Sequence, residues 1–365
     1  MPLYLTDDQV MLRDTARAFM GDEGAIPKQY RKFRDMNCKD GFGHALWRQF
    51  GELGFTGILA ADDDGGLGLG HVEAGVVLEE VGRNLTPSPF LITAVGAVEA
   101  LKGSAHRERW LPGILAGETV AALAIDEGAK HRPDTIAMRA ERSGNGYTLT
   151  GTKQFVVQGA SADVFIVAAR SDEGLGLFLV EKGTQGLAVE GVRLADASIG
   201  ARVTFTDVRV DDAIGDAAVL DRVLNAVRVG AAAEQVGVAS GAMTMSVNYL
   251  RQRKQFGKLI GEFQALQHRA AHLYSELEIA RAAVLKAQQL LDAGSAESEL
   301  MVSVAKAKVG RVSALAVQEG VQMHGGIGMT DEHDIGLYMK RDRVLAELFG
   351  DANYHADRVA RLSGY

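Results

Sequence analysis

Hydrophobic periodicity changes twice along this 365-residue chain, and these changes constrain the fold more than any other feature. Residues 1–118 follow the helical period, residues 119–222 form short strand-like runs cut by turns, and residues 223–365 return to the helical period. The strand-like runs follow one another without the intervening helices of a Rossmann unit. This order predicts an α+β chain with three domains: N-terminal helices, a small antiparallel barrel or sandwich, and a C-terminal helical bundle.

Local signals predict several individual elements. Thr6 precedes an amphipathic run and is predicted to cap the first helix. The sequence SGNG at 143–146 lies between two strand-like runs and predicts a β-hairpin. Long bundle helices are predicted at 223–253, 262–292 and 296–324, with a last helix from about Asp334.

Composition argues against several classes of partner. A net charge of −8 disfavours nucleic acid and anionic membranes as main partners. Cys38 is the only cysteine, so the chain has no intrachain disulfide and no cysteine metal cluster. The first residues lack the basic and apolar regions of a signal peptide, and the longest apolar runs are too short to cross a bilayer. We therefore expect a cytoplasmic protein with no nucleic-acid partner and no membrane partner.

Two bundle segments carry groups suited to an anionic ligand. In RQRKQFGKLIGEFQ (251–264), Arg253 offers a fork of N–H donors for a phosphate, and Gly257 allows a close turn. In VQMHGGIGMTDEH (321–333), three glycines break a helix and expose backbone N–H groups near the amide of Gln322. Each segment is also compatible with ordinary structure, a solvated helix–helix turn in the first case and a helix end with its loop in the second.

Two other residues invite a chemical role. His324 has neither a second ligand at helical spacing nor a cysteine partner, so no metal site is predicted. Asp351, in ELFGDANYH (347–355), directly follows Gly350 at the end of a helix-like run. Asp351 is either a catalytic carboxylate or a turn and helix-cap residue, because Gly-Asp-Ala-Asn suits a turn.

The ordered set of segments resembles the acyl-CoA dehydrogenase family. RKQFG with FQ at 253–264, QMHGGIGMT at 322–330, and the N-terminal runs LTDDQVMLRDTARAF and GELGFTGILAADDDGGLGLG carry a resemblance that covers nearly the whole chain. It implies an α-helical domain (1–118), a β-barrel (119–222) and a four-helix bundle (223–365), with FAD between barrel and bundle. It also implies α,β-dehydrogenation of an acyl-CoA substrate by a glutamate base and the flavin, with electrons passing to an electron-transfer flavoprotein.

The resemblance also assigns cofactor-binding residues by position. In the bundle, the residues that match segments reaching the FAD of a neighbouring subunit are Arg253, Phe256, Gln264, Gln322, Gly325 and Gly326. In the barrel, Phe155 and Val157 match positions beside the flavin. Because the implied FAD sites are shared between subunits, we expect a homo-oligomer or a hetero-oligomer with a related chain.

The sequence departs from the family pattern at the base and at the flavin. The family's usual catalytic glutamate aligns with Gly350, and the alternative position, which precedes Arg228, holds Val227. Two hydroxyls that would bond the flavin align with Ile125 and Val157. The backbone N–H of Gly350 is still able to bond a thioester oxygen, because a main-chain donor does not depend on its side chain. The groups lent to a neighbour's FAD are thus kept, whereas those for the chain's own flavin and base are changed.

Two hypotheses follow from this asymmetry. In the first, the chain is an FAD-dependent acyl-CoA dehydrogenase in which Asp351 is a displaced base and Gly350 frees the loop to re-aim it. In the second, the chain is a non-catalytic partner subunit that completes the FAD site of a second, catalytic acyl-CoA dehydrogenase chain. A nucleic-acid-binding member of the superfamily is disfavoured, because the chain is acidic and has no run of Lys and Arg.

Overall fold

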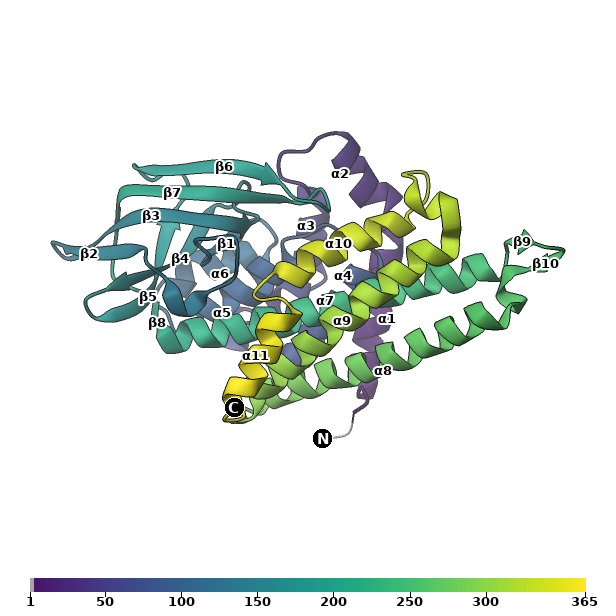
Figure 1. The fold of residues 1–365 in the computed structure, drawn as a ribbon. Helices are drawn as coiled ribbons and strands as arrows, with labels where there is room; N and C mark the ends of the chain where they lie inside the picture. Colours follow the sequence, from purple (N-terminus) through teal and green to yellow (C-terminus); the bar gives the residue numbers. More distant parts are fainter. Residues whose placement is uncertain (1–2) are drawn as a thin grey trace. The chain divides into compact units, whose positions relative to one another are not determined.

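The computed structural model describes residues 3–365 and has the predicted α+β architecture (Figure 1). N-terminal helices precede a middle β-sheet, and a bundle of long helices follows. The chain divides into two compact units, which we call the helical unit and the sheet unit. The helical unit comprises residues up to Tyr30, His71–Thr86 and Arg228–Tyr365, and the sheet unit comprises Arg31–Gly70 and Pro87–Val227. The three-domain boundaries at residues 118 and 222 stay a prediction.

Seven α-helices and a short hairpin build most of the helical unit as far as the structure describes it. The helices are α1 (Asp7–Asp22), α4 (His71–Arg83), α7 (Ala217–Leu250, which begins in the sheet unit), α8 (Gln264–Asp292), α9 (Ser298–His324), α10 (Ile335–Glu347) and α11 (Ala352–Leu362). Strands β9 (Lys254–Gln255) and β10 (Lys258–Leu259) form an antiparallel hairpin between α7 and α8. The three predicted long helices are confirmed, although α7 starts earlier than predicted. The predicted helix from about Asp334 is confirmed as α10, and α11 follows it as a further helix that was not predicted.

Side chains cap the starts of both N-terminal helices of this unit. Thr6 Oγ1 accepts the N–H of Gln9 at 3.3 Å, and Gln9 Oε1 accepts the N–H of Thr6 at 3.0 Å, so the predicted cap is confirmed. Helix α4 is capped by Asp292 at the end of α8, which accepts the N–H groups of His71 at 2.6 Å and Val72 at 3.2 Å. This second cap ties an early segment of the chain to the C-terminal bundle.

Apolar faces hold the helices of this unit together. Leu266, Leu273 and Leu277 recur on one face of α8; Leu273 and Leu277 are buried, and Leu266 is partly buried. A larger core cluster joins Val238 of α7, Val317 of α9 and Leu345 of α10. Full burial of one such side chain contributes roughly 1.5–3 kcal/mol. The C-terminal part of the chain is therefore a packed bundle on which exposed loops can be positioned.

The sheet unit combines short helices with an eight-stranded sheet. Its α-helices are α2 (Lys32–Asp35), α3 (His44–Glu52), α5 (Val98–Leu101) and α6 (Arg107–Leu115), and a buried π-helix spans Phe90–Ala97. Its strands are β1 (Ala121–Ala124), β2 (Arg139–Ser143), β3 (Gly146–Val157), β4 (Val164–Ser171), β5 (Gly174–Glu181), β6 (Leu187–Arg193), β7 (Ile199–Val210) and β8 (Gly215–Asp216). The strand order is β6-β7-β3-β2-β4-β5-β8, and β1 also pairs with β4.

Most neighbouring strands are antiparallel, as predicted, but the β1–β4 and β2–β4 pairs are parallel. The predicted hairpin is confirmed, because Ser143 pairs with Gly146 and Gly144 adopts a φ of 64° in the turn. Strand β4 is buried along most of its length, whereas β6 lies at one edge of the sheet and is largely exposed. No helix in the described part of the chain has the length and apolar character needed to cross a membrane.

Candidate functional site

The segment after α10 holds both predicted catalytic residues. Helix α10 ends at Glu347, and α11 begins at Ala352. Between them Phe349 and Gly350 adopt positive φ values of 57° and 106°. Positive φ values are readily available to glycine and are costly for other residues. This turn lies at the end of the helix-like run that the sequence indicated.

Asp351 is the N-cap of α11. Its Oδ1 atom accepts the backbone N–H of Asn353 at 3.0 Å and that of Tyr354 at 2.8 Å. A carboxylate at this position satisfies helix donors and interacts favourably with the helix dipole. The structure therefore gives Asp351 the helix-cap role that was one of its two predicted roles, and its role as a base stays a prediction.

Gly350 lies where a side chain has no room. A Cβ atom on Gly350 would lie 2.3 Å from Cδ1 of Tyr354 and 3.0 Å from Nε2 of His355. A glutamate at this position would need both a strained backbone and a displaced tyrosine ring. The backbone N–H of Gly350 lies 3.4 Å from the carbonyl oxygen of Glu347, and its predicted donation to a thioester stays a prediction.

A buried arginine holds this turn from inside the bundle. Arg228 of α7 is only 1% exposed, and its Nε donates to the carbonyl oxygen of Phe349 at 3.3 Å. Its Nη2 donates to the hydroxyl of Tyr354 at 3.2 Å, and its guanidinium lies 5.7 Å from the centre of that ring. Nε2 of His355 lies 3.1 Å from the same Phe349 carbonyl. We call Arg228, Tyr354 and His355 the clamp, because together they fix both ends of the turn.

A second buried cation supports the end of α10. Lys306 of α9 donates to Oε1 of Gln235 at 2.9 Å and to the carbonyl oxygen of Leu345 at 2.8 Å. Gln235 in turn donates to Oδ1 of Asp342 at 3.1 Å. Burial lowers the pKa of Lys306 to about 8, although the carboxylate of Asp342 opposes this change. Burial also raises the pKa of Asp342. This network joins α7, α9 and α10 just before the turn.

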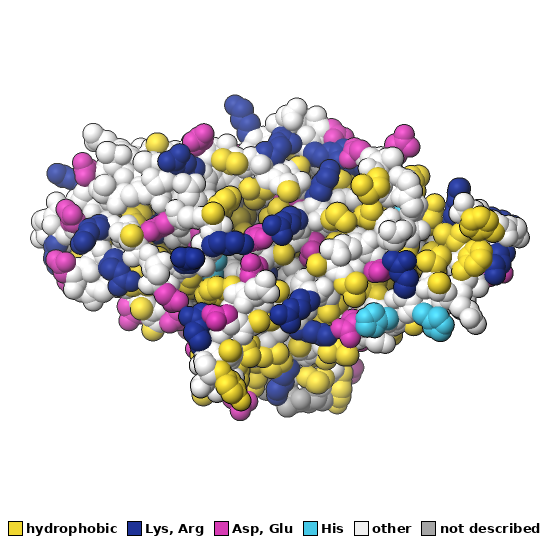
Figure 2. All heavy atoms as spheres, viewed as in Figure 1, with side chains coloured by type: hydrophobic (Ala, Val, Ile, Leu, Met, Phe, Trp, Pro, Cys, Tyr) yellow, Lys and Arg dark blue, Asp and Glu magenta, His cyan; other side chains and the backbone are white. Residues whose placement is uncertain are grey.

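The predicted FAD-binding residues of the bundle lie in a different environment, at the end that carries the β9–β10 hairpin (Figure 1). Arg253 and Gln264 are exposed on either side of the hairpin, and Phe256 at its tip is 83% exposed. A small apolar cluster of Leu250, Ile260 and Met323 packs the hairpin against the end of α9. In Figure 2 hydrophobic side chains gather at the surface of this end beside Lys and Arg side chains.

The glycine-rich segment lies at this same end. It follows the last residues of α9, and one of these, Met323, belongs to the apolar cluster described above. Gln322, Gly325 and Gly326 are exposed, and a Cβ on either glycine would meet no atom within 4 Å. His324 is buried instead, with Nδ1 2.7 Å from the carbonyl oxygen of Gly320. The structure thus brings the two predicted anion-binding segments together and turns their polar groups outward.

The predicted flavin-contacting residues of the sheet unit lie at the end of β3. Phe155 is 54% exposed and adopts a φ of 51°, which is unusual for an aromatic residue. Val157 is half-buried, and Ile125 is buried. The carbonyl oxygen of Ile125 accepts a hydrogen bond from the ammonium of Lys153 at 3.0 Å. None of the side chains of Phe155, Val157 and Ile125 carries a hydrogen-bonding group.

The loop that follows Ile125 is held by an internal ion pair. Lys153 donates to Oε1 of Glu127 at 2.8 Å, and Glu127 also accepts the N–H groups of Ala137 and Met138. Burial lowers the pKa of Lys153. Burial raises the pKa of Glu127, but the hydrogen bonds from Lys153 and the backbone outweigh it and leave that pKa below its usual value. Glu127 is therefore a structural carboxylate that shapes this loop.

FAD, the cofactor implied by the resemblance, fits these regions unequally. The bundle end presents an exposed guanidinium, exposed amides and unobstructed glycines, which suit the phosphates and ribose of a dinucleotide. In the sheet unit, Phe155 offers a ring face for stacking, but Ile125 and Val157 offer no side-chain hydrogen bond to a flavin. The helical unit fits its share of an FAD site, and the sheet unit lacks the side-chain donors at these two positions.

Sequence reasoning missed the clamp. Arg228 was noted only as the residue after Val227, and nothing in the chain pattern indicated that it reaches Phe349 and Tyr354. These contacts join residues more than a hundred positions apart, so local patterns do not report them. The only local signal was the pair of rings, Tyr354 and His355, directly after the acid.

Three family models match the chain in order. The acyl-CoA dehydrogenase N-terminal domain matches residues 6–118, the middle domain matches 125–212, and the C-terminal domain matches 215–363. The curated relative acyl-CoA dehydrogenase IpdE2 from Mycolicibacterium smegmatis is 31% identical over 349 residues, which cover 95% of this chain and 96% of that protein.

Solved structures agree with these matches. A variant of the Tcur3481-Tcur3483 steroid ACAD is 29% identical, with a TM-score of 0.91 and 98% of both chains covered. The ChsE4-ChsE5 complex from Mycobacterium tuberculosis is 25% identical, with a TM-score of 0.93 and 100% of both chains covered. The resemblance found in the sequence is confirmed, and the chain belongs to the acyl-CoA dehydrogenase family of flavin-dependent oxidoreductases.

Proposed function

We propose that this chain is the supporting subunit of a hetero-oligomeric acyl-CoA dehydrogenase. The assembled enzyme would carry out the FAD-dependent α,β-dehydrogenation of an acyl-CoA thioester and pass electrons to an electron-transfer flavoprotein. The observation that carries this proposal is the geometry of Asp351. Its Oδ1 accepts two backbone N–H groups of α11, and the residue before it is a glycine with no room for a longer side chain.

The chemistry explains why this observation matters. The α-proton of a thioester is only weakly acidic, so its removal needs a carboxylate positioned against it. FAD, when bound, supplies the hydride acceptor that no side chain offers. In this chain, Oδ1 of Asp351 accepts two backbone N–H groups, which holds the carboxylate at the start of α11. Arg253, Gln264 and Gln322 remain exposed and are able to bind the cofactor of another subunit.

Two of the similar solved structures bear the names of protein pairs, Tcur3481-Tcur3483 and ChsE4-ChsE5, and a pair of unlike chains is what this proposal requires. One of them is named a steroid ACAD, which makes a steroid-derived acyl-CoA the first substrate to test.

Co-expression tests the division of labour. The chain is purified alone and together with an acyl-CoA dehydrogenase encoded beside it, and the visible absorption spectrum and subunit masses are recorded. A colourless chain that joins a yellow, active hetero-oligomer is the expected result. A yellow homo-oligomer of this chain alone that dehydrogenates acyl-CoA would refute the supporting role.

Asp351→Asn separates the cap from the base. Asparagine caps a helix about as well as aspartate, so the fold is kept while the carboxylate is lost. We expect the hetero-oligomer to retain its full rate with Asp351→Asn. Asp351→Ala removes the cap as well and should lower the free energy of unfolding by about 1 kcal/mol. A rate loss of about a hundredfold or more with Asp351→Asn, at unchanged stability, would make Asp351 the base.

A further inference from the structure

A cavity of about 380 Å³ opens in the helical unit, away from every predicted site residue. Its walls come from the chain before α1 and from α1, α4, α7 and α8. Apolar side chains on one side of it include Val76, Val236, Val284 and Leu285. This volume is in the range of small-molecule sites. The acyl-CoA dehydrogenase chemistry described above makes no use of it.

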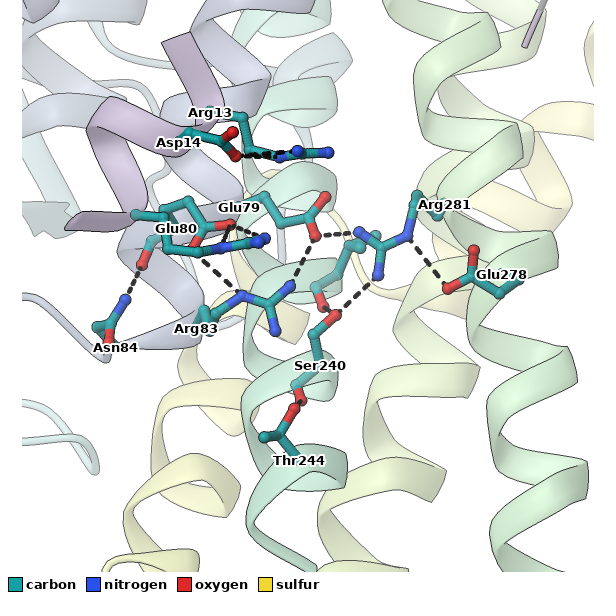
Figure 3. Close-up of polar contacts among 12 residues, drawn as sticks. Arg13, Asp14, Glu79, Glu80, Arg83, Asn84, Ser240, Thr244, Glu278 and Arg281 are labelled. Atoms are coloured by element: carbon teal, nitrogen blue, oxygen red, sulfur yellow. Dashed lines mark hydrogen bonds and ion pairs between the residues drawn. The ribbon is translucent and has the colours of Figure 1, made fainter. Parts of the chain in front are cut away.

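Arginines dominate the charged lining of this cavity. Among the described residues, the lining holds Arg13, Arg17, Arg83 and Arg281, but only two carboxylates, those of Glu79 and Glu278. Figure 3 shows Glu79 between Arg83 and Arg281, with Glu278 and Ser240 as the other partners of Arg281. Both carboxylates are therefore already bound by arginine.

The unused hydrogen-bonding capacity of this lining lies mainly in donors. A guanidinium has five N–H groups. Arg13 uses Nε and Nη2, which donate to Oδ1 of Asp14 at 3.0 and 2.9 Å. Within the described chain its Nη1 group is left for another acceptor. Asp14 and Glu80, which lie outside the lining, neutralise part of its charge, so the attraction for a carboxylate comes from the remaining N–H donors.

A buried amide also faces this cavity. Gln288 of α8 is 4% exposed and lines the cavity, and it has no hydrogen-bond partner among residues 3–365. A Cβ on Gly75 would lie 1.8 Å from its Nε2 atom, so the glycine of α4 leaves the space that this amide occupies. Because no group within residues 3–365 uses it, this amide is available to a ligand or to water in the cavity.

We propose that this cavity binds a small carboxylic acid with a hydrocarbon tail. The carboxylate takes the spare N–H groups of the arginines and of Gln288, and the tail lies along Val76, Val236 and Val284. The site is separate from the turn at Gly350, so the proposal does not depend on which subunit carries the base.

Octanoate is a suitable probe, with octanol as its uncharged match. Both are titrated by calorimetry into the purified full-length chain, in whatever oligomer it forms. We expect octanoate to bind with a stoichiometry of one per chain and octanol to bind at least about tenfold more weakly. Absence of octanoate binding, or equal affinity for octanol, would overturn the proposal.

Variants locate the site. Arg13→Gln should weaken octanoate binding about tenfold, whereas Arg311→Gln, an exposed arginine on α9, should leave it unchanged. Gln288→Leu should weaken binding without lowering the free energy of unfolding, because it removes an amide that has no partner within residues 3–365. Octanoate that binds Arg13→Gln and Gln288→Leu as tightly as the unaltered chain occupies another site, and the proposal is then wrong. Arg13 is partly exposed, so its variant tests the idea even if Gln288→Leu fails to fold.

Discussion

Two regions of the helical unit were predicted to serve the reaction, and they differ in whether their polar groups are bonded within the chain or exposed. The turn at 348–351 is closed by its own chain, because the clamp and the cap of α11 use its polar groups. The bundle end, with Arg253, Gln264 and Gln322, leaves its polar groups exposed. A chemical group is available to a cofactor or a partner only where the chain itself has not used it. This contrast favours a chain that lends groups to a second subunit.

The largest effect is expected from Arg228→Met at the closed turn. The change removes the donor to the Phe349 carbonyl and to the Tyr354 hydroxyl inside the bundle. The free energy of unfolding, measured with urea, should fall by about 3–4 kcal/mol. Arg343→Met, at a side chain that is 71% exposed, should change it by less than about 0.5 kcal/mol. A loss below about 1 kcal/mol at Arg228 would mean that the clamp does not hold the turn.

The next largest effect is expected in the contribution of Lys306 to the free energy of unfolding, which depends on pH. Its pKa is about 8 in the folded chain and about 10.4 in an unfolded one. Between these values the unfolded state binds more protons, so this residue makes the free energy of unfolding rise with pH, by up to about 1.4 kcal/mol per pH unit. Below about pH 8 the lysine is protonated in both states, and this slope disappears.

The measurement compares urea unfolding of the unaltered chain with that of Lys306→Met from about pH 7 to about pH 10. The difference between the two should change with pH only above about pH 8, whereas exposed Lys340→Met should show no such change. A difference that stays constant over the whole range would contradict the lowered pKa of Lys306.

Substitution of one glycine in each region allows the turn at 348–351 and the bundle end to be compared directly. Gly350 and Gly257 both have positive φ values, 106° and 81°, but only Gly350 faces a ring where a Cβ would lie. Gly257→Ala should cost about 1 kcal/mol from backbone strain alone. Gly350→Ala should cost about 2–3 kcal/mol, and part of this excess should return in the double variant with Tyr354→Ala. Equal costs for the two glycines would show that Tyr354 does not block this position.

The smallest effect on stability is expected at the open end. Arg253→Gln should change the free energy of unfolding by less than about 0.5 kcal/mol, because the side chain is exposed. It should nevertheless lower the affinity of the hetero-oligomer for FAD about tenfold, since a charged fork is lost. Fluorescence titration of the flavin measures this affinity, with exposed Arg311→Gln as the control. Unchanged FAD affinity would remove the bundle end from the cofactor site.

Local sequence patterns predicted helices, helix caps and turns, because these features depend on residues close together in the chain. The predicted helix at 262–292 lies close to the observed bounds of α8, and Thr6 and SGNG correctly predicted a helix cap and a hairpin turn. The end of the helix-like run near Gly350 was predicted, but the further helix α11 that begins at Ala352 was not.

Contacts between residues far apart in the sequence could not be predicted from local sequence patterns. The parallel pairing of β1 with β4 brings Ala121 beside Val164 through a choice of neighbours that no local pattern encodes. The role of Asp351 also depended on geometry, since the same letters suit a base or a cap. The arginine-lined cavity draws on segments that are far apart in sequence, and only the folded chain assembles it.

The cap that Asp292 places on α4 has a consequence for synthesis of the chain on the ribosome. Helices α1 and α4 leave the ribosome early, but their partners in the helical unit begin only at Arg228, and the cap comes near the end of α8. The sheet unit, in contrast, has all of its residues once Val227 has emerged. We expect the sheet unit to fold first. During this time α4, whose sequence lies between the two segments of the sheet unit, has an apolar face that is not yet buried. A nascent chain with exposed apolar surface is prone to aggregation, so this is the stage at which we expect a chaperone to bind.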